Sequence, residues 1–473
     1  MKEVRNEYKP LSKQTLPLPP GTFGLPLLGD TIGFFTDPNF GKNKHKKYGP
    51  IFKSSLLGSP TLFVKGSVAN QFVFSNKNQC LEISWPPSTK ALLGNLSLAL
   101  QTGHEHQSRR KLLAQAFRPR ALAGYVETMQ AITEQYGQKW VALNNTLIWY
   151  PELRDYTLDV ACKLLVGIDN GSQSALGHFF EAWCAGLFTI PLNLPWTQFG
   201  KAKRSRVKLL QEVERIIRDR QQAPDPGTDT LGLLLQARDD DGNGLSLDEL
   251  KDQILLLLFA GHETLTSAIA SFCMLIAQHP EVWDKLRTEQ QAFGEFANGV
   301  PTPEELKQMP YLDNVLQEVL RFIPPVGGGF RKVLKDCEFN GYRIPKGWTI
   351  LYQINQTHLN QDEYDNPEAF DPDRFTTAPE DSIQNRYRWV PFGGGLRECL
   401  GKEFARLEMK LFAVHLLRHY TWELLPDQDL SMAIVPTPHP RDNLQVRFQA
   451  SPMDFNAAMR DGLREGDRTV VQS

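Results

Sequence analysis

The stretch Phe392-Gly393-Gly394-Gly395-Leu396-Arg397-Glu398-Cys399-Leu400-Gly401 decides the fold of this chain of 473 residues. Three consecutive glycines have little use except where the backbone must approach another group closely. Cys399 follows them, and apolar residues at helical spacing begin at Phe404. A cysteine at a helix N-terminus beside Arg397 lies in positive potential, which favours the metal-ligating thiolate. The alternative is a buried structural cysteine after a glycine turn.

The combined spacing of Phe392, Gly395, Arg397, Cys399 and Gly401 argues against a cysteine with a purely structural role. It resembles the haem-binding signature of the cytochrome P450 family, F-x-x-G-x-R-x-C-x-G, with no departure at the named positions. The resemblance implies that Cys399 ligates the iron of haem b and that the other four residues form the haem-binding loop. Backbone N–H groups freed by the glycines are expected to hydrogen-bond the sulfur.

Composition and charge exclude several classes of protein. A net charge of −2 argues against a general nucleic-acid binder, which needs a basic excess. No two of the six cysteines lie within twenty residues of each other, which excludes CxxC metal sites and a disulfide framework. The longest apolar run, residues 254–260, is far shorter than the ~20 residues of a transmembrane segment, and the N-terminus has no signal-peptide pattern. We therefore expect a soluble cytoplasmic protein, with peripheral membrane association as a way to collect apolar substrate.

The sequence pattern places strands towards both ends of the chain and helices between them. It predicts a β-hairpin over residues 51–64, helices over about 67–320, short strands over 325–355 and a last helix over about 400–418. Such distant strands must pair across the helices, which favours a single domain over 17–450, between a flexible N-terminus at 1–16 and a polar tail at 451–473. The fold class is mainly α with small β-sheets (α+β). The resemblance implies the family's helix-rich triangular prism, with a long central helix over the haem and the sheets at one side.

A second motif interrupts the helix expected near residues 247–278, whose apolar centre ends abruptly at Gly261-His262-Glu263-Thr264. An acid and an alcohol inside a buried helix are costly unless they are paired. Taken alone, the pattern also fits a threonine bonded back to the carbonyl of Ala260 and a surface glutamate. It resembles the family's A-G-x-E-T motif, which implies that Ala260 and the glycine lie against the haem. The same resemblance implies that Thr264 hydrogen-bonds dioxygen and that Glu263 relays protons to it.

A third motif combines Glu318-Val319-Leu320-Arg321 with a distant arginine, Arg374. By default a glutamate and an arginine three residues apart form an exposed pair worth ~0.3 kcal/mol. The apolar residues around this pair leave little exposed surface. The two segments resemble the family's E-x-x-R and meander motifs, which implies a buried structural lock behind the haem, made of Glu318, Arg321 and Arg374.

Cations for the haem propionates are also implied by the resemblance. His106 and Arg110 fit the family's W-x-x-x-R helix, with the histidine in place of the tryptophan. Arg331 fits the family's strand arginine, and Arg397 is the third arginine donor. For Arg110 the alternative is a solvated basic face on a helix.

The segments that contact substrate in the family are here rich in aromatic residues and poor in charge, which suits a long apolar ligand. Some of these aromatic residues are expected to be ordinary core. SWPPSTKALLG and PPVGGGFRKVLKDCEFNGYRIPKGW resemble the retinoic-acid hydroxylase branch and its cyanobacterial relatives, which implies hydroxylation of a retinoid or related isoprenoid acid. Fatty-acid, sterol and terpene hydroxylases remain alternatives. The expected pocket residues are Trp85, Trp183, Phe259, Val326, Gly328, Phe330 and Met432.

The resemblance further implies a monooxygenase that uses dioxygen, a hydrophobic substrate and an electron-donor protein. No flavin domain is fused to the chain, so we expect a ferredoxin with its NAD(P)H reductase. A non-catalytic haem sensor or carrier would use Cys399 but would have no use for Glu263 and Thr264. Haem enzymes that use peroxide often replace this acid–alcohol pair, so its presence favours dioxygen.

Overall fold

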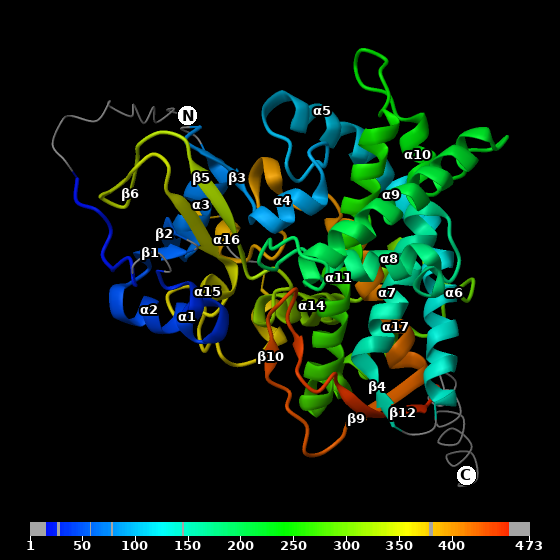
Figure 1. The fold of residues 1–473 in the computed structure, drawn as a ribbon. Coiled ribbons are helices and arrows are strands. Elements are labelled where there is room, and N and C mark those ends of the chain that lie inside the picture. Colours follow the sequence, from blue (N-terminus) through cyan, green and yellow to red (C-terminus); the bar gives the residue numbers. More distant parts are fainter. Residues whose placement is uncertain are drawn as a thin grey trace, which may run out of the picture.

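Helices dominate the chain, and a long central helix crosses the middle of the molecule (Figure 1). A computed structural model describes residues 16–453 except 26–28, 57, 77–78, 144–145 and 378–381. The expected N-terminal flexibility and most of the expected polar tail lie outside these residues. The α-helices are α1 Thr31–Thr36, α2 Phe40–Tyr48, α3 Ser67–Ser75, α4 Pro87–Leu93, α5 Gly103–Leu113, α6 Pro119–Ala142, α7 Trp149–Val166, α8 Ala175–Cys184, α9 Gln198–Gln222, α10 Thr230–Gln236, α11 Leu247–Gln278, α12 Pro280–Phe293, α13 Pro303–Leu306, α14 Pro310–Phe322, α15 Ile354–His358, α16 Ile383–Arg388 and α17 Lys402–His419. Short 3-10 helices cover Ala114–Phe117, Gly171–Gln173, Pro372–Phe375 and Gly395–Arg397.

The described strands form four sheets, and the two largest lie in different parts of the molecule, whereas β6-β7 and β10-β11 are two-stranded (Figure 1). The order β1-β2-β8-β5-β3 gives a five-stranded sheet, and β4-β12-β9 gives a three-stranded one. The expectation of sheets at one side is therefore corrected. The strands are β1 Ile51–Leu56, β2 Ser59–Val64, β3 Leu81–Ser84, β4 Leu147–Ile148, β5 Gly328–Val333, β6 Cys337–Phe339, β7 Tyr342–Ile344, β8 Thr349–Gln353, β9 Tyr420–Leu424, β10 Met432–Ala433, β11 His439–Pro440 and β12 Gln445–Ala450.

Pairing between distant strands builds both sheets, as the sequence pattern predicts. β1 and β2 form the expected antiparallel hairpin, and β2 then pairs in parallel with β8, where Thr61 faces Thr349. In the smaller sheet Leu147 of β4 faces Val446 of β12. Each sheet therefore ties an early segment of the chain to a late one.

The central helix α11 spans 32 residues, or about 48 Å at ~1.5 Å per residue. It begins with a capping box, in which the Ser246 side chain accepts from the backbone of Glu249 and the Glu249 carboxylate accepts from the backbone of Ser246. Among the described residues it is the one helix long and apolar enough to cross a membrane, yet 72% of its most apolar window is buried inside the protein. That burial is typical of a core helix.

Two hydrophobic cores meet at α11. Its residues from Leu250 to Leu258 pack with α8, α9 and α10, whereas those from Leu265 to Ile276 pack with α6, α14 and α17. The polar interruption at residues 259–264 lies between these two cores. Within this segment Ala260 is exposed, whereas His262 and Glu263 are buried.

Candidate functional site

The cysteine loop lies directly against α3. Gly395 has a φ of 65°, and a Cβ at this residue would lie 2.2 Å from the carbonyl oxygen of Phe74. Only glycine is compatible with both the left-handed conformation and this close approach. The loop is closed by the N–H of Cys399, which donates to the carbonyl of Phe392 at 2.9 Å. The glycine run is thus explained by the path of the backbone.

Cys399 is exposed, whereas the five other cysteines are all buried. Burial nevertheless raises the pKa of its thiol, against the opposing effects of the Gly401 N–H, which hydrogen-bonds the sulfur, and of Arg110. We expected the helix N-terminus and Arg397 to favour the thiolate, but burial has the larger effect on the thiol, and α17 begins only at Lys402. A bound metal ion would itself stabilise the thiolate.

One face of α11 is open although the helix lies in the core. Ala260 is exposed, whereas Leu258 and Leu265 on either side are 0% and 2% exposed. A Cβ placed on Gly261 would meet nothing within 4 Å. The open face therefore offers room for a flat group beside Ala260 and Gly261, as the haem-binding prediction requires.

Leu98 links the cysteine loop to α11 through its two backbone groups. Arg397 donates to the carbonyl of Leu98 at 3.3 Å and also to the carbonyl of Gln101. The N–H of Leu98 donates to the side chain of Gln253 on α11 at 2.9 Å. Hydrogen bonds through Leu98 thus connect the cysteine loop to α11.

Four side chains that can donate hydrogen bonds to an anion lie close together beside these hydrogen bonds: His106, Arg110, Arg331 and Arg397. Burial lowers the pKa of His106 to about 4, and the charges of Arg397 and Arg110 lower it further. Burial, then Arg331 and Arg110, lower the pKa of Arg397 to about 10, with Glu82 opposing them. No salt bridge to a carboxylate is formed by Arg110, Arg331 or Arg397 within the described part of the chain. Three mutually repelling arginines beside a neutral histidine suit the two carboxylates of haem, so the residues present fit the implied cofactor.

Thr264 and Glu263 point to different surroundings. Thr264 is half-buried on the open side of α11, and its hydroxyl donates to the carbonyl of Ala260 at 2.6 Å, as the simpler reading of the sequence allowed. Glu263 is not at the surface, because its side chain is 1% exposed. Its carboxylate accepts from both terminal nitrogens of Arg154 on α7, at 2.9 and 3.2 Å. In this arrangement Glu263 is engaged with α7 and not with Thr264.

Sequence reasoning missed the partners of Glu263. Arg154 Nη2 also contacts both carboxylate oxygens of Glu181 on α8, at 2.7 and 2.9 Å. His262 Nε2 lies 3.3 Å from Glu181 and 3.8 Å from Glu263. Burial raises the pKa of Glu181, but His262 and Arg154 outweigh it and lower that pKa to about 2. No sequence motif contains these residues, since Arg154 and Glu263 are 109 positions apart.

The residues expected to form the structural lock are in contact. Arg321 donates to both oxygens of Glu318 at 2.6 and 2.7 Å, and both side chains are 0% exposed. Arg374 donates to Glu318 at 3.1 Å. The remaining donors of Arg321 reach the carbonyls of His358, Pro367 and Ala369. The default reading as an exposed pair is therefore wrong.

The expected substrate residues do not share one environment. Trp183 is 0% exposed and its indole donates to the carbonyl of Leu92, so it belongs to the core and does not line open space. Trp85 is half-buried and donates to the carbonyl of Ala99. A Cβ at Gly328 would lie 2.2 Å from the carbonyl oxygen of Tyr352, which explains that glycine by close strand packing. Phe259, Phe330 and Met432 are half-buried, and Val326 is exposed.

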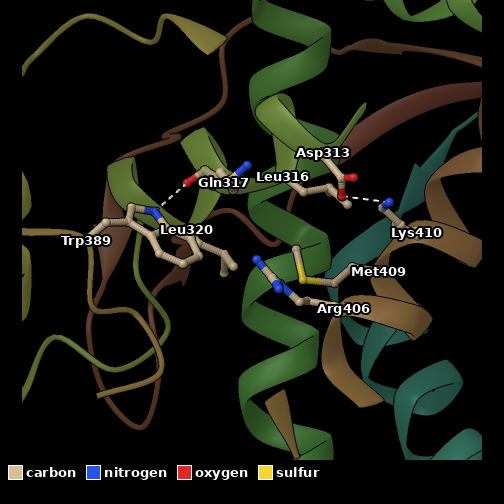
Figure 2. Close-up of a pocket in the computed structure, with 8 residues that line it drawn as sticks. All are labelled: Asp313, Leu316, Gln317, Leu320, Trp389, Arg406, Met409 and Lys410. Carbon is tan, nitrogen blue, oxygen red and sulfur yellow. Dashed lines mark hydrogen bonds and ion pairs between the residues drawn. The ribbon is translucent and has the colours of Figure 1, made fainter. Parts of the chain in front are cut away.

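A small crevice lies between α14 and α17 (Figure 2). Its volume of about 20 Å³ suits a water molecule and not a substrate. Lys410 and Asp313 form an ion pair at 2.7 Å on its rim, and Trp389 donates to the carbonyl of Gln317 at 3.1 Å. Arg406 lies beside Met409 on the same helix.

Comparison with known proteins gives consistent matches over most of the chain. The model of the cytochrome P450 family matches residues 19–442. The "Putative cytochrome P450 120" of Synechocystis sp. is 51% identical over 93% of this chain and 99% of its own length. Cytochrome P450 26A1 of Gallus gallus is 36% identical over 92% of this chain and 90% of its own. A solved structure, "Retinoic acid bound cyanobacterial CYP120A1", superimposes with a TM-score of 0.85 and 51% identity, covering 92% of this chain and 100% of that one.

Proposed function

Because the chain belongs to the cytochrome P450 family and is a haem-thiolate monooxygenase, we propose that it hydroxylates a retinoid or a closely related isoprenoid acid. The observation that carries this proposal is the 51% identity to a protein whose structure is described as binding retinoic acid. The half-buried aromatic residues Phe259 and Phe330 suit a polyene or ring, since such pockets are mostly apolar. Fatty-acid, sterol and terpene hydroxylation are the alternatives.

We propose non-covalently bound haem b as the cofactor. When bound, it supplies the iron centre at which dioxygen is activated. Cys399 would provide the thiolate ligand, and Phe392, Gly395 and Gly401 would shape the loop around it. His106, Arg110, Arg331 and Arg397 would bind the propionates. Acid–acetone extraction tests this identity, because a covalently attached haem would stay with the protein.

The residues of α11 are assigned distinct tasks. Ala260 and Gly261 would leave room for the haem, Thr264 would hold dioxygen through its hydroxyl, and Glu263 would move a proton at its carboxylate. Glu318, Arg321 and Arg374 would stabilise the fold behind the haem without taking part in chemistry. The electron donor proposed is a ferredoxin with its NAD(P)H reductase, and the protein is proposed to work in the cytoplasm.

Substrate orientation is proposed from the chemistry of the expected pocket residues, none of which carries a charge. A carboxylate buried among apolar residues is costly without a cation, so the acid group should stay near the mouth and the apolar end should enter first. Hydroxylation should then fall on the ring or methyl terminus remote from the acid.

A binding screen by Soret shift tests the substrate class. Retinoic acid, its methyl ester and retinol should each shift the Soret band, with dissociation constants within about tenfold of one another. Fatty acids and sterols should bind more weakly. Stronger binding of a fatty acid or sterol would refute the retinoid proposal, and product analysis would then show which carbon is oxidised. The sensor or carrier alternative would be favoured if no electron donor gave either substrate-dependent NAD(P)H consumption or product.

A further inference from the structure

Glu263 is held in a buried cluster that contains more negative than fixed positive charge. The cluster comprises Arg154 on α7, Glu181 on α8, and His262 and Glu263 on α11. Arg154 is the one arginine or lysine that contacts the two carboxylates among the described residues. Its guanidinium donates to both oxygens of each carboxylate. A single cation is therefore shared between two acids.

The two acids differ in burial. The Glu263 side chain is 1% exposed, whereas that of Glu181 is 43% exposed and that of Arg154 is 20% exposed. Glu181 also contacts His262 Nε2, while His262 Nδ1 lies 2.9 Å from the hydroxyl of Thr157. Glu181 thus has a second partner and access to solvent, but Glu263 depends on Arg154. Glu181 can therefore stay paired with Arg154 even when the carboxylate of Glu263 moves away.

This asymmetry bears on how Glu263 can act. To serve Thr264, its carboxyl group must turn away from Arg154, towards the open side of α11. Separating a buried ion pair is costly because it leaves an uncompensated charge. In this cluster Arg154 would remain paired with Glu181, so the release of Glu263 leaves no orphaned cation.

We propose that Arg154 and Glu181 are positioning residues for the reaction: Arg154 holds Glu263, and Glu181 keeps Arg154 paired while Glu263 is released. This inference rests on the proton-relay role proposed above for Glu263. The neighbouring ionisable groups on the packed elements are Tyr150 and Asp155 on α7, Cys184 on α8, and His439, which stacks on Tyr150. None of them supplies a second permanent cation to the cluster.

A double-mutant cycle in the holoenzyme tests whether Glu181 assists the release of Glu263. It uses Glu181→Gln, Glu263→Gln and the double variant. With Glu181 neutral, Arg154 holds Glu263 more tightly, so product formed per NAD(P)H should fall about fivefold, the lower end of usual coupling between sites. The same change should have no further effect when Glu263 is already glutamine, and Glu181→Asp should keep most of the wild-type ratio. An equal loss from Glu181→Gln in both backgrounds, or no loss, would overturn the proposal. If Glu263→Gln alone changes nothing, the relay role itself fails.

Unfolding of the holoenzyme in urea gives a readout that does not depend on turnover. Arg154→Met should lower the midpoint because it leaves two carboxylates without a cation, and adding Glu263→Gln should restore part of the loss. Absence of this rescue would contradict shared pairing. Asp229→Asn is the matched control, since it breaks a similarly buried pair with Arg220 at 2.7 Å. It should lower stability without changing product per NAD(P)H.

Discussion

The backbone N–H of Val390 donates to Nε2 of His358 at 3.0 Å. The other ring nitrogen of His358 lies 3.2 Å from the carbonyl oxygen of Arg321. One buried imidazole therefore joins the Glu318–Arg321 pair to the chain two residues before Phe392, where the cysteine loop begins. Because Nε2 accepts and Nδ1 donates, the ring is neutral in the folded protein.

Acid should weaken this connection. Burial, and then the charge of Arg321, lower the pKa of His358 to about 3 from its usual value near 6.5. The unfolded chain therefore binds more protons between these values, and the contribution of His358 to stability is lost as the pH falls from about 6.5 towards 3. His358→Gln should lower the free energy of unfolding at pH 7 by about 1–3 kcal/mol. It should also flatten the acid slope in urea denaturation, and an unchanged slope would contradict this account.

The lock should show a graded response to substitution. Glu318→Gln leaves Arg321, with 0% exposure, without its ion-pair partner and should cost about 3–5 kcal/mol of unfolding free energy. Arg374→Met should cost less, because Arg321 keeps both bonds to Glu318. Arg215→Met removes two ion pairs at the surface of α9, with Glu212 and Asp219, and should have little effect. Equal losses for the three variants in urea denaturation would contradict a buried lock.

Thr264 should govern how much of the consumed NAD(P)H leads to hydroxylated product. Thr264→Val keeps the side-chain shape but removes the hydroxyl that now donates to Ala260. Haem content and substrate-induced Soret shifts should stay unchanged, while product per NAD(P)H falls and peroxide rises. Thr264→Ser is the matched control and should retain coupling. Unchanged product per NAD(P)H in Thr264→Val would remove Thr264 from the proposed mechanism.

Glu408 on α17 should make the protein less stable as the pH rises. Its side chain is 1% exposed, Oε1 has no hydrogen-bond partner within the described chain, and burial raises its pKa well above the usual value. A carboxyl group that stays protonated when folded binds more protons than in the unfolded chain above about pH 4.5. Stability is therefore lost as the pH rises above that value. Glu408→Gln should raise the thermal midpoint more at pH 8 than at pH 5, and an equal shift at both would contradict this.

Docking of an acidic ferredoxin should depend on exposed cations next to Cys399. Arg406 and Lys402 on α17 have side chains 42% and 31% exposed. Replacing both by Ala should slow reduction of the haem in stopped-flow measurements and weaken its dependence on salt. Lys410 offers a matched control, because it is buried and donates to the carbonyl of Leu306. It also pairs with Asp313 (Figure 2). An equal effect of Lys410→Met on the salt dependence would contradict this choice of residues.

Short motifs and local patterns predicted much of this molecule. The cysteine loop and the β1–β2 hairpin each depend on residues that are close in sequence. The Arg154–Glu263 contact and the His358–Val390 bond could not be predicted, because each joins separate elements. Trp183 shows a second limit. A large apolar residue in a helix looks the same in sequence whether it fills the core or lines a pocket.

The parallel pairing of β2 with β8 also constrains how the protein is made. Thr61 leaves the ribosome roughly 290 residues before its partner Thr349, a delay of about a quarter of a minute to a minute at ~5–20 residues per second. Val446, which pairs with Leu147, follows even later than Cys399. The sheet edges of the nascent chain therefore stay unprotected for most of translation. Capture of the cofactor and closure of both sheets become nearly simultaneous late events, so a shortage of haem during synthesis should favour aggregation over the accumulation of a folded empty protein.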